Sequence, residues 1–194
     1  EGIAKQSELT KGHTTHTHTP TQPTQHTNQH NQPTAQQTYH LTHTKKSLQH
    51  STVTITDTRT GTDYLVEACK ILASQDPGLS KQLGVVVFGK QAEQYASLFP
   101  FPIYPMNYVS NEKELVDIYN AVDLYVTPSL QDNLPNTIVE AMACGIPCVG
   151  FNVGGIPQMI DHLHNGYVAE YQSAKDLANG IRWTLTEGEY DNLS

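Results

Sequence analysis

The stretch that decides the fold is residues 122–157, which read VDLYVTPSLQDNLPNTIVEAMACGIPCVGFNVGGIP. It contains two short apolar runs, residues 124–127 and 148–151. Each run is bounded by proline or glycine, and such runs predict buried strands. The residues between them have a helical pattern that Gly145 is expected to end. Because parallel strands need a crossover connection, this strand–loop–helix–strand order predicts an α/β fold with a parallel sheet.

The polar residues of this stretch gather where a loop, residues 129–135, meets the helix. Asn136 suits an N-cap and is expected to start the helix. Residues three and four apart share a helix face, so Asn136, Thr137 and Glu140 are neighbours. The N–H groups and partial positive charge of a helix start suit a phosphate, and carboxylates at Asp132 and Glu140 suit sugar and ribose hydroxyls. The pattern therefore outlines a site for a nucleotide-sugar.

These motifs resemble, in order, those of the retaining glycosyltransferases of family 4, which have the GT-B fold. The resemblance rests on an acid-x7-acid pair, Asp132 and Glu140, and on the segments PS, NLPNT, EAMACG and GGIP around it. It covers residues 57–187. It implies an α/β fold with a Rossmann-like, doubly wound parallel sheet. It also implies that the chain is the C-terminal, donor-binding half of a GT-B enzyme. The family usually has Glu at the first acid, and Asp132 is one methylene shorter.

The resemblance also implies which residues carry the chemistry. Asp132 and Arg59 are the predicted catalytic residues, Asp132 at the donor sugar and Arg59 at the diphosphate. The family has a lysine where this chain has Thr60, and one lost charge-assisted contact costs about 1.5–3 kcal/mol. The predicted donor-binding residues are Glu140, Asn133, Leu134, Pro135, Asn136, Thr137, Gly89 and Tyr108. A solvated loop cation at Arg59 and a merely packed aromatic at Tyr108 are the alternatives that the residues leave open.

The implied reaction needs little from the protein beyond charge stabilisation. The acceptor hydroxyl attacks on the face from which the diphosphate departs, and the leaving phosphate takes the proton. Preorganised donors at the helix start, together with Arg59, stabilise the developing phosphate charge. No cofactor and no metal is expected, because the helix start and the cation replace it.

Size and charge limit the partners. The 194 residues suffice for one domain with a core, whereas a complete GT-B enzyme has two. A net charge of −8 disfavours nucleic acid. The expected partners are a nucleotide-sugar donor and an acceptor saccharide or lipid-linked glycan, bound through an N-terminal half. With no signal peptide or transmembrane run, the expected location is the cytoplasm, peripheral at the inner membrane face through that half, in bacterial polysaccharide or cell-envelope synthesis.

Residues 1–50 differ from the rest and are predicted to be a separate segment before a domain at 51–194. They are rich in Thr, Gln and Asn and hold eight of the ten histidines. This composition predicts disorder, because too little apolar surface can be buried. Two alternatives are metal capture by the histidines and a degraded first strand near residues 47–51. Residues 53–56 alternate and predict a strand of their own.

The remaining pattern alternates between helices and strands. Helices are expected at about 62–74, from 110, at 158–162 and at 174–187, and strands at 85–88, within 99–108 and at 166–169. As a function, the sequence favours the donor half of a retaining glycosyltransferase, inactive without its acceptor half. The alternatives are a non-catalytic nucleotide-sugar-binding module and a His-rich metal-binding protein.

Overall fold

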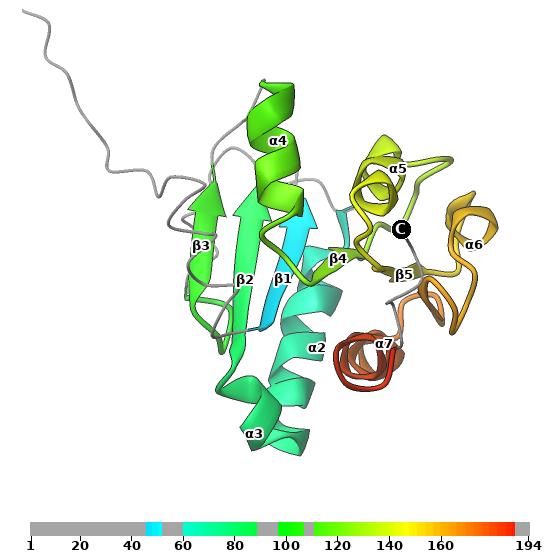
Figure 1. The fold of residues 1–194 in the computed structure, drawn as a ribbon. Helices are drawn as coiled ribbons and strands as arrows, with labels where there is room; N and C mark the ends of the chain where they lie inside the picture. Colours follow the sequence, from blue (N-terminus) through cyan, green and yellow to red (C-terminus); the bar gives the residue numbers. More distant parts are fainter. Residues whose placement is uncertain (1–45, 52–59, 89–96, 107–110, 189–194) are drawn as a thin grey trace, which may run out of the picture. The chain divides into compact units, whose positions relative to one another are not determined.

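One parallel sheet of six strands organises the described parts of the computed structural model, which are residues 46–51, 60–88, 97–106 and 111–188. The strand order is β3-β2-β1-β4-β5-β6 (Figure 1). The strands are β1 (Lys46–Ser51), β2 (Leu83–Phe88), β3 (Ile103–Met106), β4 (Leu124–Thr127), β5 (Cys148–Phe151) and β6 (Gly166–Ala169). Their order reverses between β1 and β4, which confirms the predicted Rossmann-like, doubly wound sheet.

Helices cover both faces of this sheet. They are α2 (Thr62–Gln75), α3 (Pro77–Ser80), α4 (Glu112–Tyr119), α5 (Asn136–Ala143), α6 (Ile156–Met159) and α7 (Ala174–Thr186). One core layer joins α2 and α7 to the sheet, and separate core clusters join α4, α5 and α6 to its other face. In Figure 1, α4 and α5 lie in the upper part of the view and α2 and α7 in the lower part.

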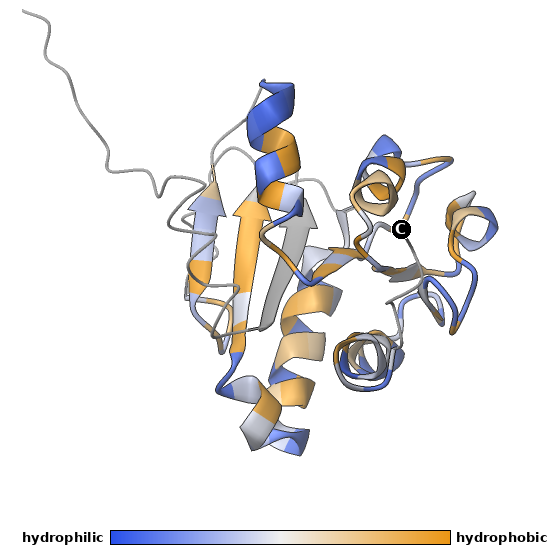
Figure 2. Ribbon diagram, in the orientation of Figure 1, coloured by the Kyte–Doolittle hydropathy of each residue, from blue (hydrophilic) through white to orange (hydrophobic). Residues whose placement is uncertain are grey.

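The two-residue period of the strands distributes side chains between these layers. In β4, Leu124 and Val126 join the α2–α7 layer, whereas Tyr125 packs with α4 and α5. In β2, Val85 and Val87 face one way and Val86 the other. A strand buried on both faces has no polar side, and β2 is accordingly hydrophobic along most of its length (Figure 2).

Three sequence predictions need correction. The predicted disorder of residues 1–50 fails at its end, because Lys46–Ser51 form β1, paired to β2 and β4. A strand near residues 47–51 was the stated alternative, and a strand is found there. The short helix expected at residues 158–162 is α6, which starts at Ile156 and places Pro157 in its first turn, where a missing N–H costs nothing. Asn136 is the first helical residue, and Pro135 takes the N-cap position.

Other predictions of secondary structure are confirmed. The bounds of β4, β5 and β6 are those predicted, and α2 and α7 differ from prediction by one residue at an end. Gly145 follows α5 with φ 73°, the left-handed conformation of a helix C-terminus. The strand predicted at residues 53–56 and the polar segment 1–45 lie outside the described residues. None of the described helices has the length and apolar character needed to cross a bilayer.

Candidate functional site

The reversal of strand order between β1 and β4 defines where a ligand belongs. In an open α/β sheet, ligands bind beyond the carboxyl ends of the strands at this switch point. The loop after β4, residues 128–135, leaves the sheet there. Gly61, which precedes α2, has φ 62° and lies so close to this loop that a Cβ would overlap the Pro128 carbonyl oxygen. The start of α2 therefore touches the loop that carries Asp132.

Two glycines after β5 hold the far side of the same loop. A Cβ on Gly154 would overlap the Asp132 carbonyl oxygen, and one on Gly155 would overlap that of Asn133. The Gly155 N–H donates to the Asp132 carbonyl oxygen at 3.4 Å. Gly154 also has φ 57°, which glycine adopts without strain. The Gly-Gly pair thus lets the backbone of the Asp132 loop sit directly on the turn after β5.

A hollow of about 610 Å³ opens between this loop and the Gly154 turn. It is lined by Leu130, Gln131, Asp132, Asn133, Leu134, Val153 and Gly154. Partial burial raises the pKa of Asp132, while the backbone N–H of Asn133 lowers it. Leu134 is 62% exposed, which is unusual for a leucine beside a core. This hollow, called the switch-point hollow because β4 is one of the two strands at the reversal, combines a carboxylate, amide groups and exposed apolar surface.

The first turn of α5 follows directly on the loop that lines the hollow. Asn136 is exposed, and Thr137 and Glu140 are partly buried. None of the described side chains caps this helix start, which has Pro135 at the N-cap position. The N–H groups of the first turn are the ones that lack partners within a helix, and the helix dipole adds partial positive charge there. The arrangement can accept an anion.

Two buried tyrosines hold the polar groups of this turn. The Tyr125 hydroxyl donates to Thr137 Oγ1 at 2.8 Å, and the Tyr119 hydroxyl donates to Glu140 Oε2 at 3.0 Å. Burial raises the pKa of Tyr125, the hydrogen bond with Thr137 lowers it in part, and Cys148, Asp132 and Glu140 add smaller increases.

The structure gathers most of the predicted site residues. Asp132, Asn133 and Leu134 line the switch-point hollow, Pro135 is buried, and Asn136, Thr137 and Glu140 follow on α5. Arg59, Gly89 and Tyr108 lie outside the described residues. The hydroxyls of Tyr119 and Tyr125 are the site groups that the sequence reasoning missed. Both tyrosines stand at buried positions of their elements, and a buried tyrosine O–H usually needs a hydrogen-bond partner, which is the signal that could have identified them.

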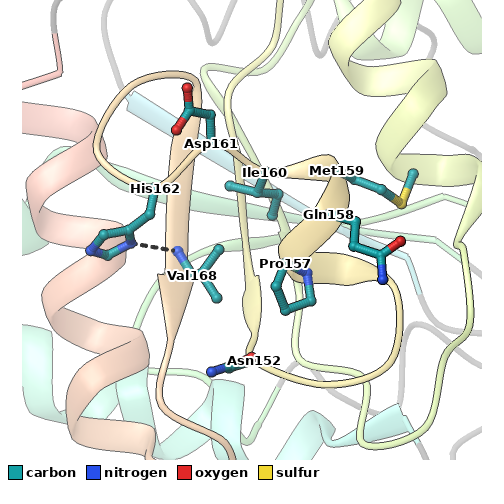
Figure 3. Close-up of a pocket in the computed structure, with 8 residues that line it drawn as sticks. All are labelled: Asn152, Pro157, Gln158, Met159, Ile160, Asp161, His162 and Val168. Carbon is teal, nitrogen blue, oxygen red and sulfur yellow. Dashed lines mark hydrogen bonds between the residues drawn. The ribbon is translucent and has the colours of Figure 1, made fainter.

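A second hollow, also of about 610 Å³, lies beside α6 and the edge strand β6 (Figure 3). Its lining residues are Asn152, Pro157, Gln158, Met159, Ile160, Asp161, His162 and Val168. His162 is exposed, and its Nδ1 accepts the Val168 N–H at 3.0 Å. Among the described residues, no three His, Cys, Asp or Glu side chains are grouped as a metal site requires. This edge hollow is built from helix-end and strand-edge groups, away from the switch point.

Comparison with known proteins identifies the class. Residues 51–187 match the family described as glycosyl transferases group 1, so the chain belongs to this glycosyltransferase family. It is 28% identical over 132 residues to an uncharacterized glycosyltransferase of Haemophilus influenzae, covering 66% of the chain and 37% of that protein. It is 30% identical over 130 residues to a D-inositol 3-phosphate glycosyltransferase of Saccharomonospora viridis, covering 61% and 30%. It is 28% identical over 147 residues to an amylovoran biosynthesis glycosyltransferase of Erwinia amylovora, covering 68% and 34%.

Solved structures agree on the fold. The Anabaena protein HepE in complex with UDP-glucose matches with a TM-score of 0.61 at 21% identity, over 75% of this chain and 40% of that one. The C-terminal domain of a group 1 glycosyl transferase from Francisella tularensis matches with a TM-score of 0.60 at 18% identity, over 79% and 83%. The chain has the fold of the C-terminal half of a GT-B glycosyltransferase and spans a third or so of the curated relatives, 37%, 30% and 34%.

Proposed function

We propose that this chain is the donor-binding domain of a retaining glycosyltransferase, which transfers a sugar from a nucleoside-diphosphate sugar to a hydroxyl acceptor. One observation carries the proposal. The start of α5 has no side-chain cap among the described residues, and it stands between Asp132, on the loop that leads into the helix, and Glu140, one turn into the helix. An anion site between two carboxylates fits a diphosphate that joins two polyols.

The diphosphate is assigned to the first turn of α5. Its N–H groups near Asn136 and Thr137 are preorganised donors, which stabilise charge without rearranging during the reaction. Arg59 is the proposed cation for the same phosphates. With these groups in place the site requires no metal, and the departing phosphate can take the proton of the acceptor hydroxyl.

The two carboxylates are assigned to the two sugars. Glu140 lies one turn into the helix, and its carboxylate would repel a phosphate that it touched. It suits the ribose hydroxyls instead, because a carboxylate accepts hydrogen bonds from them. Asp132 lines the switch-point hollow with Asn133 and Leu134, so this loop is the proposed holder of the transferred sugar. Gly89 and Tyr108 are proposed to complete the nucleotide side.

The acceptor is proposed to be a saccharide or a lipid-linked glycan of bacterial polysaccharide or cell-envelope synthesis, bound through an N-terminal half. The amylovoran relative supports this choice of pathway. Such a reaction belongs at the cytoplasmic face of the membrane, where activated nucleotide-sugars are used. The net charge of −8 argues against a nucleic-acid partner.

A second candidate is a domain that binds a nucleotide-sugar without catalysing transfer. Thr60, where the resembling enzymes have a lysine, favours it, because a neutral hydroxyl supplies less stabilisation of phosphate charge. Thr60 lies 3.1 Å from the Thr62 hydroxyl at the start of α2. An assay of sugar transfer by a protein that contains both halves separates the two candidates. Only the enzyme is expected to form product.

Calorimetric titration of the 194-residue chain with UDP, GDP and ADP tests both candidates at once. At least one of them is expected to bind and to raise the melting temperature with increasing concentration. Zinc is the matched control for a His-rich metal protein. Stabilisation by zinc, with no response to millimolar nucleoside diphosphate, would contradict donor binding.

A further inference from the structure

The polar groups of the first α5 turns face inward to two tyrosines as well as outward to solvent. Tyr119 comes from the end of α4 and Tyr125 from the middle of β4. Each ring is only 2% exposed, and the two pack edge to face with centroids 6.2 Å apart. Neither element belongs to the loop or helix that forms the donor site. The pair therefore contacts the first turns of α5 from the side of β4 and α4.

The bond from Tyr125 determines what the Thr137 hydroxyl can do. A threonine hydroxyl has one proton to donate and can accept two hydrogen bonds. Thr137 Oγ1 accepts from Tyr125 at 2.8 Å. No hydrogen bond donated by Thr137 Oγ1 is found among the described residues, and the side chain is partly exposed at the helix start. Its proton is thus left for a ligand that meets this turn.

The bond from Tyr119 determines how the Glu140 carboxylate lies. Its hydroxyl donates to Glu140 Oε2 at 3.0 Å and lies 3.4 Å from the Thr137 carbonyl oxygen. Oε1 is then the oxygen that a ligand meets without displacing the tyrosine. Burial, followed by the neighbouring Tyr125 and Glu140, raises the pKa of Tyr119, so its hydroxyl stays a donor at any working pH. A glutamate on a helix surface has three rotatable bonds, and this contact removes most of that freedom.

We propose that Tyr119 and Tyr125 are positioning residues for the donor. Tyr125 directs the Thr137 hydroxyl proton to the diphosphate, and Tyr119 fixes the Glu140 carboxylate for the ribose diol. The inference rests on the proposed function, because it needs a nucleoside diphosphate at the start of α5. It adds a side-chain phosphate ligand and a pair of buried supports to that site.

The test uses the 194-residue chain and whichever of UDP, GDP and ADP binds most tightly, together with its 2′,3′-dideoxy analogue. Tyr119→Phe keeps the ring and removes the hydroxyl. It is expected to lower the affinity for the parent nucleotide by about fivefold, the size of one net hydrogen bond. The affinity for the dideoxy analogue should fall by less than about twofold. A structural role would weaken both ligands equally, and that result overturns the assignment of Tyr119.

Tyr125→Phe is expected to lower the affinity for both ligands by about fivefold, because the Thr137 hydroxyl that Tyr125 directs meets the diphosphate that both ligands share. In a Thr137→Val background the same substitution should have no further effect, because the relayed hydroxyl is gone. An undiminished effect in that background overturns the assignment of Tyr125.

Tyr167→Phe is the matched control. It removes a tyrosine–carboxylate bond of the same length, 3.0 Å to Asp176 Oδ1, on the other side of the sheet. It should leave both affinities unchanged. Failure of the unaltered chain to bind any of the three nucleotides would overturn the proposed function itself, and the inference with it. Binding without the expected ligand and background dependence overturns the inference alone.

Discussion

The switch-point hollow and the edge hollow have the same volume, about 610 Å³, and differ in everything that bears on binding. The first lies between the loop after β4, one of the two strands at the switch point, and the turn after β5, and that loop leads into an eight-residue helix. The second lies at the end of the sheet beside a helix of four residues, and its His162 is already bonded to the Val168 backbone (Figure 3). Size alone does not mark a site; topology and unsatisfied polar groups do.

The largest expected effect concerns the acids of the two hollows. In a protein with both GT-B halves, Glu140→Ala is expected to lower sugar transfer by about 100-fold, because it removes the carboxylate proposed to accept charge-assisted hydrogen bonds from the ribose. Asp161→Ala removes an exposed acid of the edge hollow and should leave transfer unchanged. Initial rates with a saturating acceptor measure both. Equal rates for Glu140→Ala and the unaltered enzyme would remove Glu140 from the site.

A pair of glycine substitutions tests how the Asp132 loop is held. Gly154 and Gly145 both have left-handed backbone, with φ 57° and 73°. A Cβ on Gly154 would overlap the Asp132 carbonyl oxygen, whereas one on Gly145 would meet nothing within 4 Å. Gly145→Ala should therefore cost about 1 kcal/mol of unfolding free energy, and Gly154→Ala about 3 kcal/mol, with loss of nucleotide binding.

Urea unfolding and calorimetric titration of the two glycine variants provide the comparison. Because both substitutions carry the same conformational penalty, the difference between them isolates the close approach to the loop. Equal losses of stability would mean that the loop yields easily and is not fixed by the Gly154 turn.

The edge hollow has its own expected response. His162→Ala removes the acceptor for the Val168 N–H and a ring contact with Tyr167, whose centroids are 4.5 Å apart. The variant should lose about 1 kcal/mol of unfolding free energy and bind nucleoside diphosphates with unchanged affinity. A loss of affinity without a loss of stability would mean that the nucleotide binds in the edge hollow.

The smallest effect is a pH dependence at Asp132. Burial raises the pKa of this carboxyl, so the folded chain binds its proton more tightly than the unfolded chain does. Stability from this group is therefore lost as the pH rises from the ordinary pKa of an aspartate through the raised one. Asp132→Asn should become more stable, relative to the unaltered chain, between about pH 4 and pH 7.

Melting temperatures of the two proteins across that pH range measure the effect. A difference that does not change with pH would mean that the Asp132 carboxyl titrates alike in the folded and unfolded chains. The substitution is also expected to weaken sugar binding, so a gain in stability would accompany a loss of function, as is common where a site residue is strained by burial.

The sequence predicted the second half of the sheet well because its boundaries are marked. Pro128 ends β4, Gly145 ends α5 and Pro147 precedes β5, and each signal acts through local backbone geometry. β1 entered the sequence analysis only as an alternative to disorder, since KSLQHS has no apolar run and becomes a strand through pairing with β2 and β4. Local patterns cannot report such long-range pairing.

The candidate site divides in the same way. Asp132, Asn133 and Leu134 could be grouped from the sequence because one loop carries them, and Asn136, Thr137 and Glu140 because one helix does. Tyr119 reads in the sequence as part of the buried stripe of α4, and its bond to Glu140 joins residues 21 positions apart. No spacing rule predicts which hydroxyl meets which carboxylate across two elements.

A ¹H–¹⁵N NMR titration of the chain with the nucleoside diphosphate that binds tests the location of the donor site directly. The largest amide shifts are expected on residues 132–137 and Glu140, with residues 157–162 of the edge hollow unmoved. Shifts concentrated on the edge hollow, with the start of α5 unmoved, would contradict it.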